Sequence, residues 1–279
     1  MRGKARKNIS ASADSPGIRL QKYLSSIGFN SRRSVENLIR KDKIIVNGKL
    51  AKLGLRVKDG DLIKVADNFR CRVELKQKKT RVLIFNKPVG KVCSRSRDEK
   101  FESVYDCIPQ IKGAKWISVG RLDINTSGLL LFTNDGDFAS RLTHPSSNLD
   151  REYLVRVFGR DQDIAVNHLK EGVSSDGVIY RFLDIQKGRA SGQNRWYTCV
   201  LQSGKYREVR RAWESQGLQV NRLKRVRYGN IMLPVDLSVG KSVEIGGQLL
   251  HDLFDLVNYK AIKNPTCPFN NYNFFFRIF

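Results

Sequence analysis

The feature that most constrains the fold of this chain is a series of short apolar segments, separated by turn residues, that fills its second part. Each segment has the length and the β-branched and aromatic content of a strand. They read RVLIFNK, KWISVG, SGLLLFT, REYLVRVFG, GVIYRFLDI, RWYTCVLQ and LKRVRYG. Helical spacing is confined to DFASRLTH, DQDIAVNHLKEG and REVRRAWESQG. The pattern predicts an α+β domain over residues 81–258, with a large, mainly antiparallel sheet and helices packed around it.

A smaller pattern precedes this domain. The spacing of Leu20, Leu24 and Ile27 indicates one helix, and Ser31 is a suitable N-cap for a second, RRSVENLIRK. The segments IIVNGK and VKDGDLIKV each combine a short strand with a tight turn. We therefore expect a small N-terminal α/β module over residues 18–65.

Three polar or atypical segments flank these domains. Residues 1–17 are basic and lack the apolar core of a signal peptide, so we expect a disordered arm, with a transit peptide as the weaker alternative. Residues 66–80 are polar and Lys-rich, which indicates a last edge segment followed by a linker. Residues 259–279 form a tail rich in aromatic side chains, and its role is left open.

The net charge indicates the class of partner. Lys and Arg number 51 against 27 acidic residues, which gives a net charge of +24 and a pI near 10.1. Such an excess favours binding to a polyanion, either nucleic acid or an anionic membrane surface. No apolar run approaches the length of a membrane span, so nucleic acid is the better prediction. Residues 1–80 contain 21 basic and 7 acidic side chains, so this small part is the more basic one.

Basic side chains also occupy the polar sides of the two N-terminal helices. Two short helices with such a surface can follow a phosphate backbone. The side chains expected to contact phosphates are Arg19, Lys22, Arg32, Arg33, Arg40 and Lys41. The run RLQKYLSSIGFNSRRSVENLIRKDKIIVNGK resembles the small RNA-binding module first described in a protein of the small ribosomal subunit, the S-four type. The resemblance implies that this module binds RNA.

The cysteine and histidine residues bear on cofactors and location. None of the five cysteines forms a C-x-x-C pair, and the three histidines lie far apart in the sequence. This spacing favours neither a zinc site nor a disulfide framework, so we expect no metal, no cofactor and a reducing, cytoplasmic location.

One loop carries the main candidate for catalysis. VGRLDINTSGLLLFTNDG places Asp123 between two apolar strands, where its carboxylate would be fixed in direction. From spacing alone, an Asp in a polar turn is more often a turn-forming residue. The segment is, however, similar to the signature of the pseudouridine synthases that modify ribosomal RNA. That resemblance implies that Asp123 is the catalytic nucleophile.

Two further segments resemble the same family. REYLVRVFG matches the strand whose tyrosine packs against the target base, which implies stacking and a proton relay for Tyr153. SGKYREVRRAWESQG matches the segment whose basic residue pairs with the catalytic Asp, which implies this role for Arg210. Arg121 is the alternative partner, with a role in base displacement or phosphate contact. Arg207 and Arg211, on the same predicted helix as Arg210, are expected to bind RNA.

The expected reaction is the isomerisation of one uridine to pseudouridine in ribosomal RNA. HPSSNLDREYLVRVFG and VRYGNIMLP look nearest to the family members that act on 23S RNA of the large subunit, and the small-subunit enzymes are the closest competitor. We expect a monomer that binds a hairpin region of the RNA. A catalytically inactive ribosome-assembly factor that binds ribosomal RNA is the alternative, and a generic DNA-binding protein is a more remote one. The presence of Asp123, Tyr153 and Arg210 argues against an inactive protein.

Overall fold

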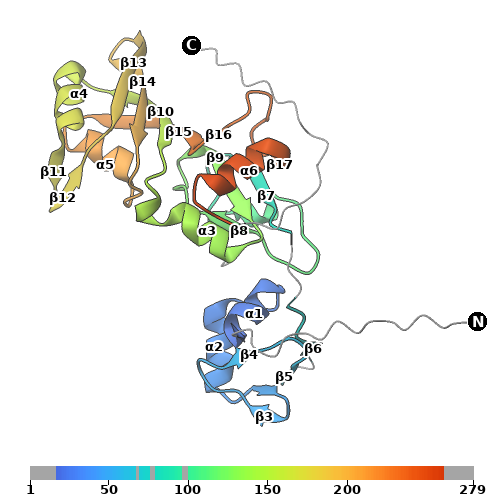
Figure 1. Ribbon diagram of the computed structural model, residues 1–279. Helices are drawn as coiled ribbons and strands as arrows, with labels where there is room; N and C mark the ends of the chain where they lie inside the picture. Colours follow the sequence, from blue (N-terminus) through green and yellow to red (C-terminus); the bar gives the residue numbers. More distant parts are fainter. Residues whose placement is uncertain (1–16, 67–68, 76–78, 96–99, 261–279) are drawn as a thin grey trace, which may run out of the picture. The chain divides into compact units, whose positions relative to one another are not determined.

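The computed structural model describes residues 17–66, 69–75, 79–95 and 100–260. Contacts between Cα atoms divide the chain into two compact units. The first comprises residues 1–78 with 112–115, and the second comprises residues 79–111 with 116–279. Figure 1 shows the helices and strands of both units. The basic arm, apart from residue 17, and all of the aromatic tail beyond residue 260 lie outside the described residues.

The N-terminal unit combines two short helices with small strands. Its elements are β1 (Ile18–Arg19), α1 (Leu20–Ser26), α2 (Arg32–Arg40), β2 (Ile44–Val46), β3 (Lys49–Leu50), β4 (Arg56–Val57), β5 (Leu62–Val65) and β6 (Phe69–Arg72). The predicted cap is present, since the side chain of Ser31 accepts a hydrogen bond from the backbone N–H of Ser34 at 3.1 Å. Asn47 and Gly48, with φ of 48° and 81°, form the left-handed turn between β2 and β3. Leu20, Val35 and other apolar residues of these elements form one core.

The polar segment after residue 65 contains structure that belongs to this unit. β6 pairs antiparallel with β5 at the edge of a four-stranded sheet of order β3-β2-β5-β6. Val73, which follows β6, is 1% exposed and lies in the same core. The edge strand thus completes the module, and its sheet ends only after residue 72.

The second unit is built on a nine-stranded sheet. Its strands are β7 (Val82–Lys87), β8 (Ile117–Val119), β9 (Ser127–Thr133), β10 (Arg151–Phe158), β13 (Asp184–Ser191), β14 (Asn194–Leu201), β15 (Gln219–Tyr228), β16 (Ile231–Met232) and β17 (Ser242–Ile245). The order is β13-β14-β10-β15-β9-β7-β17, with β8 paired to β9 and β16 paired to β15. Every pair in this sheet is antiparallel except β9 with β15. The predicted α+β class with a mainly antiparallel sheet is therefore confirmed.

Helices pack on this sheet through two separate apolar cores. They are α3 (Gly136–Thr143), α4 (Gln162–Glu171), α5 (Glu208–Glu214) and α6 (Gly247–Asp255). One core joins α4 and α5 to β10, β14 and β15, and the other joins α3 and α6 to β7 and β9. Figure 1 shows the two pairs of helices at different regions of the sheet. Along β7 and β9, successive side chains alternate between the two cores, as the strand period requires.

Two local predictions were incomplete or wrong. The segment GVIYRFLDI was expected to be one strand, but it breaks between β12 (Val178–Tyr180) and β13. β12 pairs with β11 (Val173–Ser175) in a separate two-stranded sheet, whereas β13 pairs with β14. Phe182, between them, is buried in the core at 2% exposure, so the chain must turn inward there. Helix α6 was not predicted, because its N-cap is Gly246, which has no side chain to make a cap.

Candidate active site

A cleft of about 1040 Å³ in the second unit brings several predicted residues together. Arg121, Asp123 and Tyr153 line it, and Arg207 lies on its wall. The lining comes mainly from the β8–β9 loop, from β10 and from the loop between β14 and α5. Arg210 is buried at 5% exposure and does not line the cleft.

Asp123 lies in a short loop whose shape is fixed from both ends. The loop leaves β8 through Gly120, with a left-handed φ of 72°, and the backbone N–H of Thr126 donates to the carbonyl of Asp123 at 3.0 Å. At the other end, β9 runs against β15 at Gly128, where an added Cβ would lie 2.2 Å from the carbonyl oxygen of Arg225. Only glycine allows this parallel contact, so the sequence T-S-G directly determines how the loop enters the sheet.

The buried side chain of Lys87 supports the loop through hydrogen bonds. Lys87, the last residue of β7, is fully buried, and its ammonium donates to the carbonyls of Pro88, Asp123, Ile124 and Thr126 at 3.0, 3.2, 3.4 and 2.9 Å. Burial lowers the pKa of Lys87, while Cys93 and Asp123 act in the opposite direction. The side chain of Lys87 contacts the backbone of the loop that carries Asp123.

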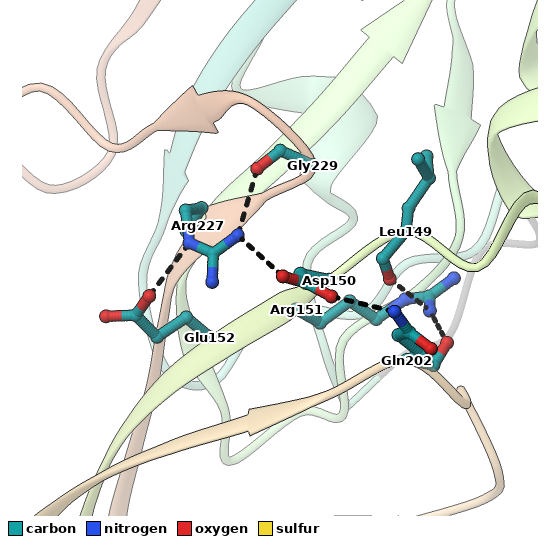
Figure 2. A network of polar contacts seen from close by, with 7 residues as sticks. All are labelled: Leu149, Asp150, Arg151, Glu152, Gln202, Arg227 and Gly229. Carbon is teal, nitrogen blue, oxygen red and sulfur yellow. Dashed lines mark hydrogen bonds and ion pairs between the residues drawn. The ribbon is translucent and has the colours of Figure 1, made fainter. Parts of the chain in front are cut away.

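Tyr153 projects into the cleft from β10. It is 9% exposed, and the pairing of β10 with β15 shifts register between Glu152 and Tyr153. Figure 2 shows the polar network beside this shift. The Arg227 guanidinium donates to the Glu152 carboxylate at 2.8 Å and lies 3.4 Å from the carboxylate of Asp150, which also accepts from Gln202 at 3.0 Å. These contacts join the residues that precede Tyr153 to β15 and to the segment that follows β14.

Arg210 reaches the loop of Asp123 from α5. Its guanidinium donates to the carbonyls of Val220 at 2.7 Å and of Asn125 at 2.8 Å. Burial lowers the pKa of Arg210, Arg207 lowers it further, and Asp123 opposes both effects. The ion pairs found among the described residues do not include one between Arg210 and Asp123, so that pairing stays a prediction. In this structure Arg210 braces the loop two residues beyond the carboxylate.

Comparison with known proteins shows the family to which this chain belongs. A model of the RNA pseudouridylate synthase family matches residues 81–215, and an S4 domain model matches residues 18–63. Ribosomal large subunit pseudouridine synthase B of Vibrio vulnificus is 44% identical over 254 residues, which cover 91% of this chain and 79% of that protein. The chain belongs to the RNA pseudouridylate synthase family.

Other relatives support the same assignment. The protein of that name from Pseudomonas aeruginosa is 45% identical over 250 residues, or 89% of this chain, and the match spans 65% of that longer protein. The relative from Vibrio cholerae is 45% identical over 249 residues and 78% of its length. A pseudouridylate synthase of known crystal structure aligns with 86% of this chain at a TM-score of 0.56 and 24% identity, which supports the fold.

The remaining arginines of this synthase differ in their surroundings. Arg121 is exposed and lines the cleft. Arg207 is the N-cap of α5, has a left-handed φ of 50° and lies 3.8 Å from the Glu214 carboxylate. Arg211 does not line the cleft, and its guanidinium lies 5.0 Å from the ring centre of Tyr206. Arg211 thus contacts an aromatic ring, and the RNA binding expected of it stays a prediction.

Two supporting residues of the site were missed from the sequence. Lys87 follows the apolar run VLIF and Asn86, but a lysine is rarely fully buried, so little in the sequence indicated its burial. Arg225 of β15 is 2% exposed and donates to the carbonyl of Leu129 at 2.8 Å. It resembled any other basic residue of LKRVRYG, so no sequence signal separated it from an exposed arginine.

Two features are absent from the described ranges of the chain. There, no group of three or more His, Cys, Asp and Glu side chains is placed to hold a metal ion. No helix in the same ranges is both long enough and apolar enough to cross a membrane.

Proposed function

We propose that this chain isomerises a uridine to pseudouridine in the ribosomal RNA of the large subunit, with Asp123 as its nucleophile. The observation that carries the proposal is a carboxylate on a braced loop that opens onto a cleft lined by Tyr153. The family to which the chain belongs, and the activity in the names of its relatives, point to the same reaction.

The reaction breaks the N-glycosidic bond, turns the base and joins carbon five of uracil to the sugar. The Asp123 carboxylate attacks the sugar or the uracil ring, or assists departure of the base, and then assists formation of the new bond. The target must leave its helix, so an aromatic surface is needed to hold it. The ring of Tyr153 provides that surface, and its hydroxyl relays the proton that carbon five loses. No electrons are gained or lost, so the proposed route needs no redox cofactor, and each of its steps is assigned to a side chain of this protein.

The N-terminal unit is proposed to dock the enzyme on its RNA. Five of the six basic side chains predicted to contact phosphates are exposed, and Lys22 is half-buried. The substrate that we propose is a hairpin region of 23S RNA, bound by a monomer in the cytoplasm. The names of the bacterial relatives support the large subunit, and the S4 domain match supports RNA binding.

Mapping pseudouridine in ribosomal RNA tests the proposal. Cells without the gene should lack pseudouridine at one or more sites of 23S RNA, and the wild-type gene should restore them. A gene encoding Asp123→Asn should not restore them, whereas an inactive assembly factor would leave the map unchanged in every strain. No difference at any uridine would contradict the proposed function.

A further inference from the structure

A second aromatic side chain at the cleft is not used by the proposed mechanism. Tyr206 lies in the loop between β14 and α5, lines the cleft and is 67% exposed. A large aromatic ring exposed to this extent loses the stabilisation of burial. A partner that covered the Tyr206 ring would restore that stabilisation.

The loop that carries Tyr206 is closed by defined contacts. The Glu208 carboxylate accepts from the backbone N–H of Lys205 at 3.1 Å and also from the Ser203 hydroxyl. The Lys205 ammonium donates to the carbonyl of Ile179, and the side chain of Gln202, at the start of the loop, belongs to the network in Figure 2. Tyr206 is consequently presented by a closed turn, which lowers the entropy lost when a ligand binds.

The Tyr206 ring is also supported by a cation. The Arg211 guanidinium lies 5.0 Å from the ring centre, within the range of a cation–π contact. Arg207 adopts its left-handed conformation directly between Tyr206 and helix α5. Such a conformation is unfavourable for a residue with a side chain. Here it turns the chain between Tyr206 and α5, and the Tyr206 ring lies beside the Arg211 guanidinium.

The positively charged residues around the Tyr206 ring suit the binding of nucleic acid. The cationic residues on the cleft lining include Arg121, Arg181, Lys205 and Arg207. The cleft volume of about 1040 Å³ is at the upper end of the roughly 300–1,000 Å³ typical of small-molecule pockets. A single extruded base thus leaves space in the cleft for a neighbouring nucleotide.

We infer that Tyr206, supported by Arg211, is the stacking platform for an unpaired base of the RNA next to the target uridine. The inference rests on the proposed function and names a further substrate contact of the same site. Stacking on exposed aromatic rings, with cations for the backbone, is the usual way in which proteins hold single-stranded RNA. A folded protein partner would need an apolar surface around the ring, but the neighbours of Tyr206 on the cleft lining include Lys205 and Arg207.

The test uses the full-length enzyme and a fragment of 23S RNA that the wild-type enzyme modifies. In single-turnover reactions, Tyr206→Ala should raise the RNA concentration for half-maximal rate about tenfold, because one stacked base is lost. The maximal rate should stay within about twofold, since Asp123 and Tyr153 are unchanged. Tyr206→Phe keeps the ring and should behave as wild type. Phe158→Ala, at a 40% exposed aromatic residue outside the cleft, is the matched control and should also behave as wild type.

A scan of the RNA identifies the partner base. Replacing each nucleotide near the target with an abasic one should reveal one position where Tyr206→Ala causes no further loss, because the two changes remove the same contact. The inference is overturned if Tyr206→Ala equals wild type, or if its loss persists on every abasic RNA. If the wild-type enzyme forms no pseudouridine in any ribosomal RNA, the proposed function itself has failed, which is a different result.

Discussion

At the scale of single residues, the site combines an accessible carboxylate with buried cations. Asp123 is half-buried at the cleft, whereas Lys87 and Arg210 are almost completely buried behind its loop. Both cations donate hydrogen bonds to backbone carbonyls of the loop. Burying a charge is costly unless it is hydrogen-bonded, so these hydrogen bonds offset the cost of burial and tie both side chains to the loop.

The two proposed roles of Tyr153, stacking against the base and relay of the proton, can be separated by substitution. Tyr153→Phe keeps the ring and removes the hydroxyl, so the variant should bind RNA as wild type and stall after the glycosidic bond breaks. Tyr153→Leu also removes the ring and should weaken binding by roughly 1–3 kcal/mol. RNA-binding titrations and single-turnover kinetics on both variants measure the two effects. A fully active Phe variant would show that Tyr153 is a stacking platform only.

At the scale of elements, features that depend on residues close in sequence could be predicted, whereas contacts between distant residues could not. The Ser31 cap and the Asn47–Gly48 turn depend on residues close in sequence, and the sequence indicated both. The contacts of Lys87 with Thr126 and of Arg210 with Asn125 join residues 39 and 85 positions apart. No local periodicity encodes such pairs, so their bracing role emerged only with the three-dimensional fold. The family resemblance supplied Asp123 and Tyr153, which spacing alone would not have singled out.

The bracing of the loop by strand β7 can be tested at Lys87. Lys87→Met keeps a side chain of similar length and removes the ammonium that donates to the loop carbonyls, at a cost of roughly 1–3 kcal/mol in unfolding free energy. The maximal rate should fall at least about tenfold, because a small displacement of a catalytic group has effects of this order. Lys241→Met, at an exposed lysine, should change stability by less than about 0.5 kcal/mol. Chemical denaturation and single-turnover rates that match wild type would contradict the bracing role.

At the scale of the whole molecule, the charge distribution suggests a division of labour. The N-terminal unit has its own core, and the catalytic unit has two others. Residues 1–80 carry 21 basic and 7 acidic side chains, and the predicted catalytic residues all lie beyond them. The small unit can therefore supply affinity through phosphate contacts while the larger unit performs the chemistry.

Removal of the first unit tests this division. Deletion of residues 1–78 removes all of β6 and should leave the two cores of the second unit complete. RNA binding should weaken, and the slope of log affinity against log salt should flatten by roughly 0.7–0.9 for each lost phosphate contact. At saturating RNA the single-turnover rate should stay close to that of the full chain. An unchanged salt slope would show that the unit does not dock on RNA, and a collapsed rate would show that it helps to build the active site.

The central claim is that the Asp123 carboxylate performs uridine isomerisation. The most direct measurement uses 23S RNA from cells lacking the gene, with tritium at carbon five of its uridines, and full-length wild-type or Asp123→Asn enzyme. Because carbon five loses its hydrogen when it joins the sugar, wild type should release tritium as pseudouridine forms. Asp123→Asn should release none above background while binding the RNA within a few-fold of wild type. Release by Asp123→Asn at the wild-type rate would contradict the account, because another residue would then be the nucleophile.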